Sequence, residues 1–69
     1  MNIGDKLNNG ATILKIMQGE RGCVVLARTN GHHPFVTWVV GPDGGAYWGH
    51  YFGQMTEAVV DFNERAARA

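Results

Sequence analysis

The side chains of this chain that are best suited to chemistry are three histidines and one cysteine. They are His32, His33, His50 and Cys23. Imidazole and thiolate are common zinc ligands, and a cysteine beside a histidine is a common nucleophile pair. The spacing supports neither arrangement. Neighbouring strand residues point to opposite faces, so His32 and His33 are poorly placed to share a metal, and no Cys-x-x-Cys pair is present. We therefore expect no metal and no cofactor.

An enzyme is also not expected from this sequence. Cys23 opens an apolar run and is interpreted as a small core side chain rather than a nucleophile. The glycines of GPDGG (41–45) precede a predicted strand, not a helix, so they indicate a turn and not a phosphate-binding loop. A chain of 69 residues also offers little room for a substrate pocket.

The segment AYWGHYF (46–52) holds most of the aromatic residues of the chain. Burying one tryptophan contributes roughly 4–6 kcal/mol, which rivals the whole expected stability of so small a domain. We therefore place at least one of Trp38 and Trp48 in the core, and burial is the favoured interpretation of the second as well. Tyr47 and Tyr51 keep a polar hydroxyl end, so they are better candidates for contact with a partner.

Glycine-rich turns divide the rest of the chain into short β-type runs. Strands are predicted at 3–7, 12–17, 23–29, 35–40 and 46–52, with Asn-Gly or Pro-Asp-Gly turns among them. Strands joined by tight turns pair with their sequence neighbours. The fold class is therefore α+β, with an antiparallel meander sheet of four or five strands that is either open or curled, as in an SH3-like barrel.

The last third of the chain changes to a helical period. A helix is predicted at 56–68, because apolar residues recur at i, i+4, i+7 and i+11. The residues of this stripe are Met55, Val59, Phe62 and Ala66. Two acid–base pairs stand four residues apart and are expected to form on the helix surface, Asp61 with Arg65 and Glu64 with Arg68. The helix is expected to pack on the sheet, and residues 1–69 to form one domain.

Two registers are open for the last hairpin. A three-residue loop places Val40 opposite Ala46 and Trp38 opposite Trp48. A four-residue loop instead places Trp38 opposite Gly49 and moves Trp48 to the other face of the sheet. The choice decides which aromatic side chains face a partner.

Charge and hydropathy limit the expected partners and the expected cellular location of the protein. Six Lys and Arg residues balance six Asp and Glu residues, so net charge predicts neither nucleic acid nor a membrane as partner. The first residues lack the apolar region of a signal peptide, and no apolar run is long enough to span a bilayer. With a single cysteine, no internal disulfide forms. A cytoplasmic location is expected.

Several segments occur in an order that resembles a known group of proteins. They are GDKL (4–7), NGATIL (9–14), VTW (36–38), YWGHYF (47–52) and EAVVDF (57–62), followed by Arg65. This layout resembles short bacterial and phage-borne accessory proteins over nearly the whole chain. The resemblance implies a mobile-element protein that acts in the cytoplasm of a bacterial host. Some small phage proteins of this kind are anti-CRISPR proteins, which implies a CRISPR effector complex as the target.

The leading hypothesis is a non-catalytic protein that binds and inhibits a host protein or ribonucleoprotein complex, as a monomer or weak homodimer. Binding hot spots are rich in Trp, Tyr and Arg. The predicted partner-binding residues are Tyr47, Tyr51, His50, Arg21 and Arg28. The alternative is a small module for single-stranded nucleic acid, with Arg and Lys on the phosphates and sheet aromatics stacked on the bases.

Overall fold

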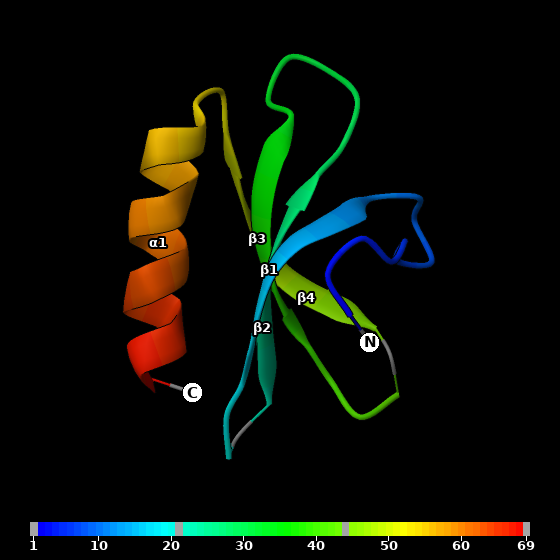
Figure 1. Cartoon of the computed structure of the whole chain (residues 1–69), viewed down its shortest axis with the longest axis vertical. Helices are drawn as coiled ribbons and strands as arrows, with labels where there is room; N and C mark the ends of the chain where they lie inside the picture. The colour runs from blue at the N-terminus through cyan, green and yellow to red at the C-terminus, as the bar shows by residue number, and fades with distance from the viewer. Residues whose placement is uncertain (1, 21, 44, 69) are drawn as a thin grey trace.

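Turns rich in glycine and asparagine separate four short strands, and a helix follows the last of them (Figure 1). The structure is a computed structural model and describes residues 2–20, 22–43 and 45–68. The strands are β1 (Thr12–Gln18), β2 (Cys23–Arg28), β3 (Phe35–Val40) and β4 (Ala46–Phe52), and helix α1 spans Met55–Arg68. They form an open antiparallel sheet in the order β1-β2-β3-β4, and α1 packs on one of its faces. The predicted meander with one C-terminal helix is confirmed.

The strand predicted at 3–7 is not formed. This segment instead contains a turn, and Lys6 makes only an isolated bridge to Thr12. Gly4 and Gly10 have φ values of 93° and 89°, which is a left-handed conformation that an extended strand does not contain. The segment therefore folds back over the start of β1, where Leu7 packs against the core.

The helix covers a core on one face of the sheet. Ala58 and Phe62 of α1 are buried against Val24 and Leu26 of β2. Partly buried residues surround this group, namely Leu14, Phe35, Phe52, Met55, Val59 and Ala66. The predicted stripe of the helix lies in this cluster in full, so its orientation is confirmed. β2 is buried on both faces from Cys23 to Ala27, as expected for a central strand.

The opposite face of the sheet has a second core with no helix on it. Trp38 is only 6 % exposed and packs there with Val25, Val36 and Val40. Ala11 and Leu7, from the folded-back N-terminal segment, lie in or against the same cluster. Trp38 is therefore the core tryptophan that the size of the domain requires.

Both registers considered for the last hairpin occur, one on each side of a β-bulge. Next to the turn Val40 pairs with Ala46, as the three-residue loop predicts. Beyond the bulge Thr37 pairs with His50, which is the register of the four-residue loop. The extra residue of β4 lies at 48–49, opposite Trp38.

The bulge reverses the faces to which the end of β4 points. Because side chains alternate along a strand, one inserted residue moves all later side chains to the other face. His50 and Phe52 therefore face α1, whereas Tyr51 faces Trp38. The rings of Trp38 and Tyr51 meet edge to face, with centroids 6.1 Å apart and planes at 89°. The three-residue register, which extends the pairing of Val40 with Ala46 along the strands, is wrong beyond the bulge.

Candidate binding surface at the bulge of β4

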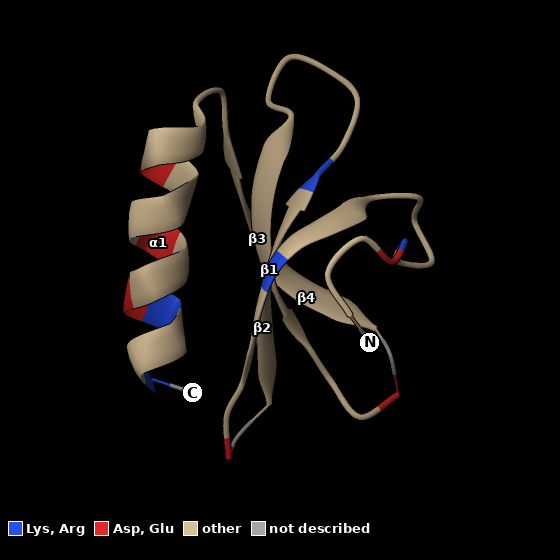
Figure 2. Cartoon of the chain, viewed as in Figure 1, with Lys and Arg blue, Asp and Glu red and all other residues tan. Residues whose placement is uncertain are grey.

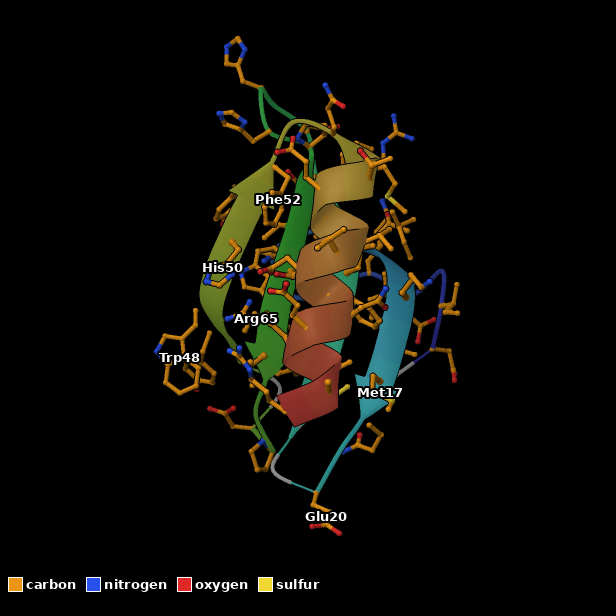
Figure 3. All side chains as sticks on the ribbon, turned by 90° about the vertical axis from the view of Figure 1, so that its left-hand side faces the viewer. Met17, Glu20, Trp48, His50, Phe52 and Arg65 are labelled. Atoms are coloured by element: carbon orange, nitrogen blue, oxygen red, sulfur yellow. The ribbon has the colours of Figure 1, made fainter. Side chains whose placement is uncertain are left out.

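Trp48 occupies the first position of the bulge and is exposed. It is the most exposed large apolar residue among those described, at 76 %, and Figure 3 shows its indole projecting from the edge of the sheet. Burial of the second tryptophan was therefore a wrong prediction. Trp48 has a φ of 52°, and no other non-glycine residue in the described ranges has a positive value. A side chain in this region costs about 1–2 kcal/mol, because Cβ crowds the following carbonyl.

The glycine of the bulge stands at the next position, Gly49. A Cβ atom at Gly49 would lie 2.5 Å from Nε1 of Trp38, so the core tryptophan excludes a side chain there. Bulges of this kind usually have glycine at their first, left-handed position. Core packing thus explains Gly49, but it does not explain a tryptophan at position 48. Tolerated backbone strain of this kind is concentrated at functional sites.

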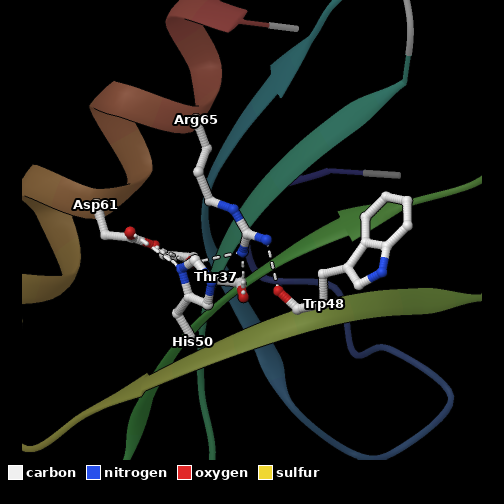
Figure 4. A network of polar contacts seen from close by, with 5 residues as sticks. All are labelled: Thr37, Trp48, His50, Asp61 and Arg65. Carbon is white, nitrogen blue, oxygen red and sulfur yellow. Dashed lines mark hydrogen bonds and ion pairs between the residues drawn. The ribbon is translucent and has the colours of Figure 1, made fainter.

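Arg65 of α1 holds the bulge through backbone oxygens (Figure 4). Its Nη2 donates a hydrogen bond to the carbonyl of Trp48. Its Nη1 donates to the carbonyl oxygen of Thr37 at 3.0 Å and to the hydroxyl of Thr37 at 3.1 Å. One guanidinium therefore fastens β3 and β4 to the helix. Hydrogen bonds from a charged donor contribute roughly 1.5–3 kcal/mol each.

Asp61 completes this network from the preceding turn of the helix. The buried hydroxyl of Thr37 donates to Asp61, and Nδ1 of His50 lies 3.0 Å from Oδ2 of the same carboxylate. Asp61 and Arg65, expected to pair on the helix surface, instead both turn toward the sheet and meet at Thr37. Partial burial raises the pKa of Asp61, but hydrogen bonds from Thr37 and His50 and the charge of Arg65 outweigh it, so the pKa is lowered. His50 thereby anchors β4 to the helix.

Tyr47 is held beside Trp48 by the turn that precedes β4. Its hydroxyl donates to Oδ2 of Asp43 at 2.7 Å, and its ring centroid lies 6.4 Å from that of Trp48. The Gly45 N–H and then the Tyr47 hydroxyl lower the pKa of Asp43, while the hydrogen bond to Asp43 raises the pKa of Tyr47. Tyr47 is 45 % exposed. Tyr47 and Trp48 form an exposed aromatic surface, here named the bulge patch.

The structure brings together only some of the predicted partner-binding residues. Tyr47 and His50 lie on β4 on either side of Trp48, and both are exposed. Tyr51 is exposed as well, but it lies on the opposite face, against Trp38. Arg28 is exposed at the far end of β2, and Arg21 lies outside the described residues.

Trp48 was not predicted as a site residue, and neither were the residues that hold the bulge and Tyr47, namely Thr37, Asp43, Asp61 and Arg65. The sequence contained one indication for Trp48. The last hairpin fitted two registers that differ by one residue, and a bulge between them satisfies both. Arg65 gave no such signal, because its bonds to the carbonyls of Thr37 and Trp48 depend on how the helix docks.

Both edge strands carry irregularities that affect binding by strand addition. The register of β1 shifts between Ile13 and Lys15, and that of β4 shifts at the bulge. Bulges and edge lysines interrupt the row of free N–H and C=O groups that another strand would need. This disfavours a homodimer formed by edge pairing.

Comparisons with known proteins return nothing for this chain. No family model, no curated protein and no solved structure matches it. Within residues 2–20, 22–43 and 45–68, no three His, Cys, Asp or Glu side chains gather as a metal site requires. The same residues form no helix with the length and apolar character needed to cross a membrane. The bulge patch is therefore described from the geometry of this structure and not by comparison with a related protein.

Proposed function

We propose that this protein is a non-catalytic binding protein that docks on a macromolecular partner through the bulge patch. The observation that carries this proposal is Trp48, a large ring that is 76 % exposed on a strained backbone. Exposing an indole to water and holding its residue in a left-handed conformation both lower stability. Tryptophan and tyrosine are also among the residues most enriched at binding hot spots. A role in binding accounts for both costs at once.

The bulge patch is organised before any partner arrives. Arg65 fixes the backbone of Trp48, and Asp43 fixes the hydroxyl of Tyr47. Immobilising a flexible side chain on association costs roughly 0.5–1.5 kcal/mol. Because the side chain of Tyr47 is already held by Asp43, the bulge patch avoids part of this cost, which favours affinity.

The resemblance of the sequence to phage-borne accessory proteins suggests the biological partner. In this proposal the protein inhibits a host defence complex by covering a surface that the complex needs, and a CRISPR effector complex is the first candidate. A standard interface covers about 800 Å² of each partner. The accessible surface of this molecule is 4543 Å², so one such interface would leave most of it free.

Binding of single-stranded nucleic acid has less support. Such modules place cations beside the aromatic rings on which bases stack. Arg65 contacts Trp48, but its guanidinium is engaged with carbonyl and hydroxyl oxygens. Arg28 lies level with Phe52, two strands away from β4, and so it is not beside Trp48.

Affinity capture from nuclease-treated lysate of the bacterial host, with matched baits, tests the proposal. Trp48→Gly removes the ring from the bulge patch, and Glu20→Gln is the control, at the tip of the hairpin between β1 and β2 (Figure 3). We expect wild type and Glu20→Gln to retain the same protein and Trp48→Gly to lose it. Circular dichroism would confirm that all baits are folded. Equal retention by Trp48→Gly would overturn the proposal, and loss of all partners with nuclease would favour nucleic acid.

A further inference from the structure

An open groove of about 350 Å³ lies between the end of β4 and α1. Phe52 and Val60 supply its apolar part, and Glu57, Asp61 and Glu64 supply its carboxylates. Val60 is 59 % exposed, so an apolar side chain stands uncovered between acidic neighbours. Neither the core nor the network around Thr37 requires Val60 to be apolar.

The carboxylates of the groove follow one side of the helix. Their spacing of four and three residues places them in a row, and Figure 2 shows acidic bands along α1. Asp61 shares its charge with Thr37, His50 and Arg65, as described above. Glu57 and Glu64 form no ion pair with any residue in the described ranges. No lysine or arginine is among the residues that line the groove, so Glu57 and Glu64 give its rim a negative charge.

We propose that this groove receives a lysine or arginine side chain of the partner protein. Such a side chain has an apolar stem and a charged head, which the groove matches in kind. The stem lies on Phe52 and Val60, and the negative charges of Glu57 and Glu64 attract the cation. This inference rests on the proposed function and adds the chemistry of the partner, which presents a basic surface.

The groove and the bulge patch both lie along β4, at different positions of the strand. Phe52, His50 and Trp48 follow one another along β4 on the same side of the helix (Figure 3). A cation is attracted to the face of an indole, so Trp48 suits a second basic side chain of the same partner. The carboxylates that line the groove disfavour the phosphates of nucleic acid there.

A titration with defined peptides tests the groove without knowledge of the partner. The probes are the capped peptides Gly-Arg-Leu-Arg-Gly and Gly-Glu-Leu-Glu-Gly, added to ¹⁵N-labelled protein and followed by NMR. We expect the arginine peptide to shift the amide signals of Phe52, Val60 and Glu64, and added salt to weaken the effect. The double variant Glu57→Gln with Glu64→Gln should bind the arginine peptide roughly threefold to tenfold more weakly. Glu20→Gln should leave this binding unchanged.

Three results would overturn the inference. They are no shifts with the arginine peptide at millimolar concentration, equal shifts with the glutamate peptide, and shifts confined to another part of the protein. The capture experiment separates this inference from the proposed function. If the double glutamine variant keeps the partner and Trp48→Gly loses it, the groove is rejected and the binding function stands. If Trp48→Gly keeps the partner and the double variant loses it, the role of Trp48 is rejected instead.

Discussion

Glycine at position 48 should make this protein more stable than alanine does. In an ordinary strand the order is the reverse, since glycine is less stable than alanine by roughly 0.5–1 kcal/mol. Trp48 has a φ of 52°. Glycine adopts this left-handed conformation without strain, whereas the Cβ atom of any other residue is crowded there. The comparison of Trp48→Gly with Trp48→Ala isolates this effect, because both variants lose the same indole.

The size of the effect follows from two opposing contributions. Alanine retains the strain of about 1–2 kcal/mol, while glycine relieves it but adds about 0.4–1 kcal/mol of chain entropy in the unfolded state. We expect Trp48→Gly to be more stable than Trp48→Ala by about 0.5–1 kcal/mol. Because Trp48 is 76 % exposed, losing its indole removes little buried area. At most about 1.5 kcal/mol is lost in this way, so the glycine variant should lie within about 1 kcal/mol of wild type.

Urea unfolding followed by far-ultraviolet circular dichroism measures these differences. Met17, exposed in a regular part of β1, provides the matched control pair. There Met17→Ala should be more stable than Met17→Gly. If alanine at position 48 were as stable as glycine or more stable, the left-handed bulge would be refuted.

Further predictions concern the residues around the bulge. Gly49→Ala should destabilise the protein by about 1–3 kcal/mol, because the new Cβ would meet Trp38, and an unchanged urea midpoint would contradict this. The lowered pKa of Asp61 means that its contribution is complete above the unfolded-state value near 4 and is lost as the pH falls through the folded-state value. The free energy of unfolding should therefore fall more steeply from about pH 5 to pH 2 in wild type than in Asp61→Asn, and parallel curves would refute this. Thr37→Val removes the hydroxyl shared by Asp61 and Arg65 and should cost about 1–3 kcal/mol, while bringing the pH dependence closer to that of Asp61→Asn.

The elements of the last hairpin and the helix were predictable because their signals are local. Turn residues and β-branched runs define 35–40 and 46–52, and both ranges agree with β3 and β4. The helix begins one residue before its predicted start, at Met55. The strand at 3–7 failed because a sequence does not show whether a glycine takes a left-handed conformation. Gly4 does so, and the segment turns over the sheet instead of joining it.

The candidate site was less predictable because it depends on packing at a distance. The argument that so small a domain must bury a tryptophan was correct for Trp38. Trp38 and the folded-back N-terminal segment already fill the face of the sheet that has no helix on it. The bulge turns Trp48 outward instead. The residue composition of a strand does not show where an extra residue is inserted. The contacts of Arg65 and Asp61 join α1 to β3 and β4, so they follow from the docked helix and not from the spacing of four residues.

The role of Trp48 as a binding anchor is tested most directly by its own fluorescence. In Trp38→Phe, Trp48 is the sole tryptophan, and the purified captured partner is added in a form without tryptophan emission. We expect the emission of Trp48 to shift to shorter wavelength and its quenching by acrylamide to fall, because the indole leaves water in the complex. A complex that forms while the emission and quenching of Trp48 stay unchanged would contradict this role.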